Sequence, residues 1–195
     1  MRKLKKIIVP KDGFRTKKIQ NYQWTENGYA PSVSVFLARG RDRLWVKFVI
    51  GEAYTLPKYL LDGEPVYKDS AVECFLKPFN DDPRYLNFEF NAAGAGILGF
   101  GMGKDEREEL IARYAQHLNV TADGDEKKWS LSFEIPFFLI EEIYGRGFAP
   151  EREKVHVNFF KCGDETEFPH YGTLFEIDYP YPEFHLPEFF GEAVF

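Results

Sequence analysis

The stretch Pro65–Pro78, "PVYKDSAVECFLKP", contains the alternation of side chains that is typical of a β-strand. Successive side chains of a β-strand point to opposite faces of the sheet. One face of this stretch is then wholly apolar, with Val72, Cys74 and Leu76. The other face carries Glu73 between Ala71 and Phe75, which is an unusual place for a carboxylate. Tyr67 lies shortly upstream, in a segment with the composition of a loop.

The same alternation recurs along most of the chain and is typical of strands. We predict strands at residues 5–10, 32–39, 43–51, 70–77, 85–92, 97–100, 128–135, 154–162, 172–177 and 192–195. Two stretches predict helices instead: residues 104–118, capped by Asp105, and residues 136–145, from Pro136 to Gly145. Many short strands with one or two helical insertions predict an all-β fold, a jelly-roll-like antiparallel β-sandwich. A length of 195 residues suits one domain over residues 1–195.

Composition excludes several classes of partner. The formal net charge of −6 argues against nucleic-acid binding, which needs clustered lysine and arginine. No apolar run approaches the ~18 residues of a membrane-spanning helix, so we expect no membrane partner. The apolar run after the basic N-terminus is too short for a secretory signal, which predicts a cytoplasmic protein unless a leader has been removed.

The cysteines Cys74 and Cys162 both fall in predicted strands. Two buried free thiols are the favoured interpretation, and one disulfide is the alternative. Neither has a cysteine or histidine neighbour at metal-binding spacing, so we expect no transition-metal site.

Three predicted strands place an apolar face opposite a face that mixes polar and aromatic side chains. The mixed faces carry Glu73 and Phe75 in the first strand, Asn87, Glu89 and Asn91 in the second, and His156, Asn158 and Phe160 in the third. Neighbouring strands would merge these faces into one surface. A solvated outer face is one interpretation. The alternative is a platform for a polyhydroxylated ligand, because carboxylates and amides bond to hydroxyls while rings cover apolar C–H faces.

The C-terminal stretch "YPYPEFHLPEFFGEAVF", residues 179–195, alternates prolines with aromatic residues. Pro180, Pro182 and Pro187 exclude a helix or a central strand in this part of the chain. We expect an ordered extended segment that closes the core and enters a last strand, in which Phe189 and Phe190 serve packing.

Several motifs in this order resemble the family 9 carbohydrate-binding modules. They are "KDSAVECFL", "YLNFEFNAAG", "VNFFKCGD", "HY" and the C-terminal "FHLPEFFGEAVF", and together they span roughly Trp45 to Phe195. The chain is most similar to the stand-alone family 9-like proteins, with a DOMON-like β-sandwich. The resemblance implies non-catalytic binding of a mono- or oligosaccharide, often at the reducing end of a chain.

The resemblance also implies roles for particular residues. Family members clamp a sugar between two aromatic side chains, and the matching positions here are Tyr67 and Phe184. Glu73 matches the glutamate that holds sugar hydroxyls, and Asn87, Glu89, Asn91 and Asn158 complete the expected polar set. Characterised members tend to carry tryptophan at both clamp positions, so the smaller Tyr and Phe rings predict weaker affinity or a different ligand. Glu89 stands where many members have a basic residue.

Other functions stay open from the sequence. Glu73 and Glu89 could form the carboxylate pair of a glycoside hydrolase, provided that burial raises the pKa of one of them. Distantly similar sandwich domains bind haem through a Met/His pair, for which Met102 and one of the four histidines are the candidates. Family members can also hold a structural calcium ion, and residues 80–82 or 123–126 could bind one weakly.

Overall fold

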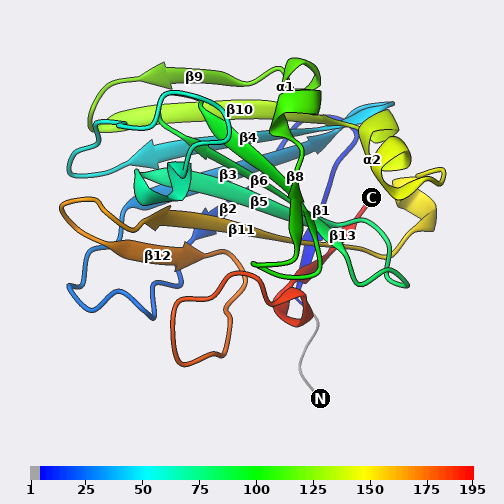
Figure 1. The fold of residues 1–195 in the computed structure, drawn as a ribbon. Helices are drawn as coiled ribbons and strands as arrows, with labels where there is room; N and C mark the ends of the chain where they lie inside the picture. The colour runs from blue at the N-terminus through cyan, green and yellow to red at the C-terminus, as the bar shows by residue number, and fades with distance from the viewer. Residues whose placement is uncertain (1–4) are drawn as a thin grey trace.

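The computed structural model describes residues 5–195. Its strands form two packed sheets with two short helices, α1 and α2, at their ends (Figure 1). The larger sheet has the order β1 (Lys6–Ile8), β13 (Gly191–Val194), β11 (Val155–Gly163), β5 (Ala71–Lys77), β6 (Tyr85–Asn91), β7 (Gly96–Gly101) and β8 (Arg107–Glu109), and β12 (His170–Thr173) also pairs with β11. The smaller sheet has the order β2 (Arg15–Ile19), β3 (Ser32–Arg39), β4 (Arg43–Gly51), β10 (Lys128–Pro136) and β9 (Thr121–Gly124).

The main core lies between the two sheets, where the alternating apolar residues of each strand meet. Val72, Cys74 and Leu76 of β5 all belong to it, as the strand pattern predicts. Every strand pairing is antiparallel apart from β1 with β13, which is parallel. The predicted all-β sandwich is therefore confirmed, with one parallel pair at the edge of the larger sheet. Cys74 and Cys162 are both free and buried, so the disulfide alternative is wrong.

The helices agree with prediction in part. Helix α2 covers Phe137–Tyr144, with Pro136 before it and Gly145 in the left-handed conformation after it. Helix α1 covers only Ile111–Leu118, so the prediction of a helix from residue 104 with Asp105 as its cap is wrong. The preceding Arg107–Glu109 forms strand β8, because its backbone pairs with Gly99–Gly101 of β7 and the chain turns back in a hairpin. Pairing with a neighbouring strand here overrides local helix propensity.

Strand boundaries agree closely in the centre of the sheets and less well at the edges. Strands β3 and β4 have the predicted limits. Strand β12, in contrast, covers His170–Thr173, whereas the sequence predicted a strand at residues 172–177. Strands β2, β8 and β9 were not predicted. Three short 3₁₀-helices, Val66–Lys68, Pro150–Arg152 and Pro187–Phe189, complete the secondary structure of residues 5–195. Within these residues, no helix is both long and apolar enough to span a membrane.

The three mixed faces do merge, because β6, β5 and β11 are consecutive in the larger sheet. They form its outer face, away from the main core. The predicted site residues on that face are buried, since Asn87, Asn91 and Asn158 are 0% exposed and Glu73 and Glu89 are 3% exposed, whereas His156 is half-buried. The interpretation of a solvated outer face is therefore wrong. The chain covers this face with its own C-terminal segment and with the β7–β8 hairpin.

Candidate functional site

The C-terminal segment lies across the outer face of the larger sheet as a strap, here defined as residues 178–190. Figure 1 shows it in orange and red, as a loop between β12 and the last 3₁₀-helix. Beneath it lies a second apolar cluster of Phe75, Tyr85, Phe160, Ile177 and Phe190. The prolines keep the strap extended, and its aromatic residues bury the rings of β5, β6 and β11. The expected ordered wrap is thus present, and it encloses a cavity.

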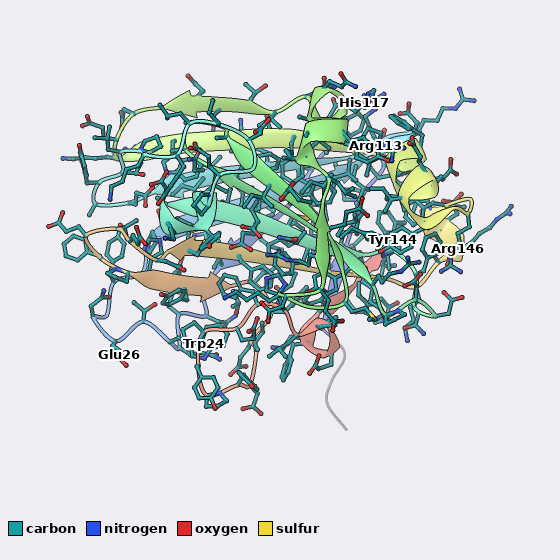
Figure 2. The ribbon with its side chains drawn as sticks, viewed as in Figure 1. Trp24, Glu26, Arg113, His117, Tyr144 and Arg146 are labelled. Atoms are coloured by element: carbon teal, nitrogen blue, oxygen red, sulfur yellow. The ribbon has the colours of Figure 1, made fainter. Side chains whose placement is uncertain are left out.

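Trp24, from the loop after β2, holds the strap from the side (Figure 2). Its indole N–H donates to the carbonyl of Tyr179 at 2.8 Å, and its ring lies 6.0 Å from that of Phe184. The Phe184 ring in turn stacks on Phe160 of β11, with centroids 4.3 Å apart and planes 14° apart. Phe184 is thereby fixed from two sides.

A pocket of about 200 Å³ opens between the strap, the β7–β8 hairpin and the ends of β5 and β11. Its lining residues are Tyr67, Glu73, Glu89, Lys104, Asp105, Arg107, Cys162, Asp164, Tyr171, Pro182, Glu183, Phe184 and His185. The predicted site residues Tyr67, Glu73, Glu89 and Phe184 are all among them. The volume is several times the ~30 Å³ that a water molecule occupies in the liquid, so the pocket has room for a small ligand.

Glu73 and Glu89 form the floor of the pocket. They are directly opposite each other on β5 and β6, so their side chains are cross-strand neighbours on one face. Burial, and then the negative charge of Glu89, raise the pKa of Glu73 well above its ordinary value. Burial also raises the pKa of Glu89, although Arg107 opposes this shift.

Arg107 reaches the floor from β8 and organises Glu89. Its Nη1 donates to Asn87 Oδ1 at 2.8 Å and lies 3.3 Å from Glu89 Oε1. The Asn87 amide also donates to Glu89 Oε1. Gly99 of β7 leaves space for this arrangement, since a Cβ there would lie 2.3 Å from Asn87 Oδ1 and 3.3 Å from the Arg107 side chain. Asn87 therefore orients Glu89 and Arg107 from behind the pocket wall.

Cys162 of β11 contacts the other carboxylate. Its thiol donates to Glu73 Oε1 at 3.1 Å, and its sulfur lies 3.6 Å from the carbonyl oxygen of Tyr67. Burial and the nearby Glu73 raise the pKa of the thiol well above its ordinary value. The thiol is thus a protonated donor that holds one oxygen of Glu73, and it links the 3₁₀-helix carrying Tyr67 to the pocket floor.

His185 lines the pocket from the strap and is uncharged at neutral pH. Burial, together with the positive charge of Arg107, lowers its pKa to about 3. Its Nδ1 shares a 2.6 Å hydrogen bond with the Tyr85 hydroxyl, whose own pKa is raised by burial. This contact fixes the strap to β6 without adding a charge to the pocket.

Like Asn87, the predicted site residues Asn91 and Asn158 lie outside the pocket lining. The Asn91 amide donates to the Tyr59 carbonyl and to Asp69, and its oxygen accepts from the Ala93 N–H. Asn158 bonds through its amide to both backbone groups of Phe175. Both side chains hold loops against the sheet, and their hydrogen-bonding groups are occupied by the protein itself.

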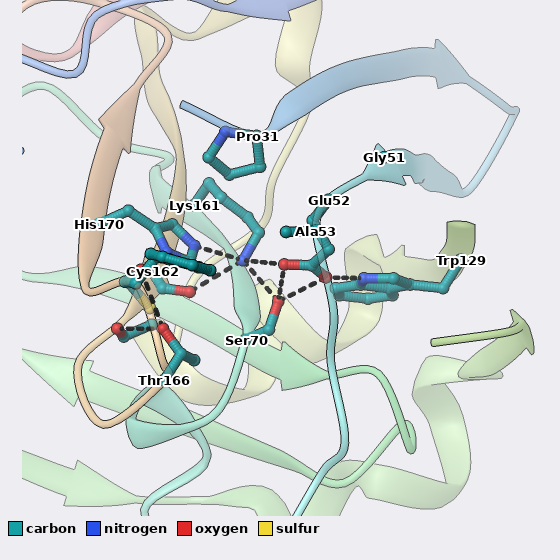
Figure 3. Close-up of polar contacts among 12 residues, drawn as sticks. Pro31, Gly51, Glu52, Ala53, Ser70, Trp129, Lys161, Cys162, Thr166 and His170 are labelled. Atoms are coloured by element: carbon teal, nitrogen blue, oxygen red, sulfur yellow. Dashed lines mark hydrogen bonds and ion pairs between the residues drawn. The ribbon is translucent and has the colours of Figure 1, made fainter. Parts of the chain in front are cut away.

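A buried polar network supports the pocket from the side of the main core (Figure 3). Lys161 Nζ donates to Ser70 Oγ at 2.7 Å and to the Cys162 carbonyl at 2.9 Å, and it lies 3.7 Å from Glu52. The third hydrogen-bond partner of Lys161 Nζ is His170 Nε2, at 2.8 Å. Burial, and then Lys161, lower the pKa of His170 to about 3, so its Nε2 accepts from the ammonium while Nδ1–H donates to the Phe168 carbonyl.

Comparisons with known proteins agree with this architecture. The chain matches carbohydrate-binding family 9 over residues 4–195. It belongs to carbohydrate-binding family 9. No curated protein matches the chain, but solved structures do. A candidate carbohydrate-binding protein from Bacteroides uniformis matches with a TM-score of 0.85 at 23% identity, over 98% of this chain and 99% of that one.

Two further structures are family 9 modules from Caldicellulosiruptor kristjanssonii. One is a complex with cellotriose and covers 97% of this chain and 93% of that chain, at 14% identity and a TM-score of 0.67. The other was solved in complex with glucose. The match covers 97% of this chain and 95% of that chain, again at 14% identity and a TM-score of 0.67. At these identities the structures show that the fold is shared.

In the two loops that the sequence suggested for a calcium ion, three aspartates accept hydrogen bonds from other groups of the protein. Asp81 accepts two hydrogen bonds from Arg146, and Asp82 accepts three from Arg84. Asp125 accepts the backbone N–H groups of Lys127 and Lys128. Within residues 5–195 no group of three or more histidine, cysteine or acidic side chains could hold a metal ion.

Sequence reasoning missed several residues of this family 9 pocket. Arg107 and Lys104 fell in a predicted helix, and only the β7–β8 hairpin brings them to the floor and the rim. Cys162 was taken for a core residue, although it shares the mixed face with Asn158 and Phe160 because residues two apart face the same way. Extending that alternation by one step along β11 would have found it.

Proposed function

We propose that the pocket binds a sugar non-catalytically, as a mono- or oligosaccharide-binding site. The observation that carries the proposal is that Phe184, more than a hundred residues from Tyr67 and Glu73 in sequence, lines one pocket with them over a polar floor. Carboxylates and a guanidinium offer the acceptors and donors that sugar hydroxyls need, and the rings offer apolar faces for pyranose C–H groups. The complexes of family 9 modules with glucose and cellotriose support the same ligand class.

We further propose that Tyr67 and Phe184 clamp the sugar between them. One face of Phe184 is stacked on Phe160, so a ligand cannot stack on that face, while another part of the side chain lines the pocket. Tyr67 is half-buried on the 3₁₀-helix Val66–Lys68, whose backbone is tied to β11 by the contact with Cys162. Because both rings are held by neighbours, little ordering entropy would be lost when a sugar binds. The pocket volume of about 200 Å³ favours a ligand of one or a few sugar units, such as the end of a chain.

The test is calorimetric titration with glucose, galactose, cellobiose and cellotriose of the parent and of Tyr67→Ala and Phe184→Ala. We expect the parent to bind at least one of them and each variant to lose at least about tenfold in affinity, because a stacked ring contributes ~1.4 kcal/mol or more. Tyr59→Ala is the control, since Tyr59 packs in the same apolar cluster as Tyr67 but does not line the pocket. Equal binding by both clamp variants and the parent would show that the clamp is wrong.

Glycoside hydrolysis is a second candidate because of one observation. Glu73 and Glu89 are cross-strand neighbours, and the pKa of Glu73 is raised by burial, as a general acid requires. However, Arg107 and Asn87 hold Glu89 Oε1, which leaves one oxygen for chemistry. Incubation with cello-oligosaccharides and measurement of new reducing ends separates the two functions. We expect no release above the rate of a Glu73→Gln variant.

A further inference from the structure

The pocket lining holds more acidic than basic side chains. Its acidic lining residues are Glu73, Glu89, Asp105, Asp164 and Glu183, whereas its basic residues are Lys104 and Arg107. His185 adds no charge at neutral pH, because burial lowers its pKa to about 3. Among the described residues that line the pocket, the ion pair of Arg107 with Glu89 is the one direct contact between opposite charges.

The imbalance is sharpest on the buried floor. Glu89 is 3% exposed, and its Oε2 is a buried atom with no hydrogen-bond partner among residues 5–195. Glu73 receives the Cys162 thiol on Oε1, and within the same residues no cation forms an ion pair with it. Of the two buried carboxyl groups, Arg107 therefore pairs directly with that of Glu89 alone. A buried acceptor without a partner is costly, and a ligand that donates to it recovers that cost.

We propose, building on the proposed sugar-binding function, that the pocket selects a sugar that carries a protonated amino group. An ammonium group offers three donors and a positive charge. The carboxyl groups of Glu73 and Glu89 both line the pocket and are cross-strand neighbours, so an ammonium group bound beside them would face both. A hydroxyl offers one donor and leaves the second carboxylate without a counter-charge. Hydrogen bonds between charged groups are also roughly twice as strong as neutral ones.

The same charges predict which sugars the pocket excludes. A uronic acid or a sugar phosphate would bring another negative charge beside two buried carboxylates, and like charges in contact are strongly unfavourable. An N-acetylated amino sugar keeps the position of the nitrogen but loses its charge, so it should bind no better than the neutral sugar. These differences distinguish recognition of a charge from recognition of shape.

The experiment compares matched sugars by calorimetric titration at pH 6.5, where a primary amine is protonated. The pairs are glucosamine with glucose and galactosamine with galactose, and N-acetylglucosamine and glucuronate are the controls. We expect the amino sugar of the better pair to bind about tenfold more tightly than its neutral partner, which is the difference between a charged and a neutral hydrogen bond. Glucuronate should bind more weakly than glucose.

A variant pair locates the effect. Glu73→Gln keeps an oxygen that accepts a hydrogen bond from Cys162 but cannot carry a negative charge. The ratio of the affinity for the amino sugar to that for the neutral sugar should therefore fall towards one. Glu126→Gln removes an exposed carboxylate that does not line this pocket, and it should keep the parental ratio.

The possible outcomes separate the two proposals. A neutral sugar that binds as tightly as its amino partner would overturn the amino-sugar inference while sugar binding stands. Failure of every sugar to bind the parent would overturn both. A tenfold preference for the amino sugar that is lost in Glu73→Gln and retained in Glu126→Gln would support both proposals. The inference does not depend on the folding of Glu73→Gln, because the ratio of the two affinities is first measured on the parent.

Discussion

At the scale of single residues, the pocket floor is a source of instability. Burial and Glu89 raise the pKa of Glu73 above its unfolded value. The folded state therefore holds a proton more tightly than the unfolded state, so stability from this group is present at low pH and is lost as pH rises through the folded pKa. We expect Glu73→Gln to unfold at higher denaturant concentration than the parent at pH 8, because glutamine cannot ionise.

The check is urea unfolding of both proteins at pH 5 and pH 8. The advantage of Glu73→Gln should shrink at pH 5, where protonation relieves the parent of the same penalty. Glu126→Gln, on the surface, should stay within about 0.5 kcal/mol of the parent at both pH values. A Glu73→Gln protein that is less stable than the parent at pH 8 would mean that the carboxylate has a favourable partner in the folded state.

At the scale of elements, the strap depends on Trp24. This side chain donates to Tyr179 and lies against Phe184, but it belongs to a partly exposed loop (Figure 2). We expect Trp24→Ala to weaken sugar binding by about tenfold, because the strap must then be ordered when the ligand binds. Global stability should fall by only about 1 kcal/mol, the worth of one hydrogen bond. Trp24→Phe is the control, since it keeps a ring and loses the N–H donor.

Titration and urea unfolding of the same samples separate these effects. Unchanged affinity in Trp24→Ala would show that the prolines and Phe160 fix Phe184 without Trp24. A loss of stability large enough to unfold the variant would show that the strap belongs to the main cooperative unit. The intermediate affinity expected of Trp24→Phe measures how much of the effect comes from the hydrogen bond alone.

The elements also show what the sequence could and could not predict. Strands β3, β4 and β5 follow from alternation, because each buries one face in the main core. Glu73 stood out for the same reason, as a carboxylate on a strand. Strand β8 could not be predicted, since its pairing with β7 depends on a hairpin and its own sequence favours a helix. Arg107 was missed with it, and so was the counter-charge of the pocket floor.

Burial of the mixed face could not be predicted from period-two alternation either. Alternation separates the two faces of a strand, but it does not show what covers the second face. The strap is more than a hundred residues from β5 in sequence and contacts it only through tertiary packing. The ring centroids of Phe75 and His185, for example, are 4.8 Å apart. The resemblance to family 9 supplied Phe184, and the structure supplied the reason that it lies over Phe160.

At the scale of the whole molecule, the Lys161 network joins the two sheets. Lys161 belongs to β11 of the larger sheet, while Glu52 follows β4 of the smaller sheet and accepts a hydrogen bond from Trp129 of β10 (Figure 3). Both side chains are buried. We propose from this link and the shared core that the described chain unfolds as one domain. Tryptophan fluorescence and far-UV circular dichroism should then report the same urea midpoint.

Lys161→Met tests the link directly. Methionine fills a similar volume but leaves the buried side chain of Glu52 without its lysine partner, and it leaves Ser70 and His170 without their donor. We expect a loss of about 3 kcal/mol in the free energy of unfolding, as when one partner of a buried pair is removed. The double variant Lys161→Met/Glu52→Gln should recover part of that loss, because no buried charge remains unpaired. Lys47→Met, at an exposed position on β4, controls for the loss of a lysine. An undiminished loss in the double variant would mean that Lys161 acts through its donated hydrogen bonds and not through its charge.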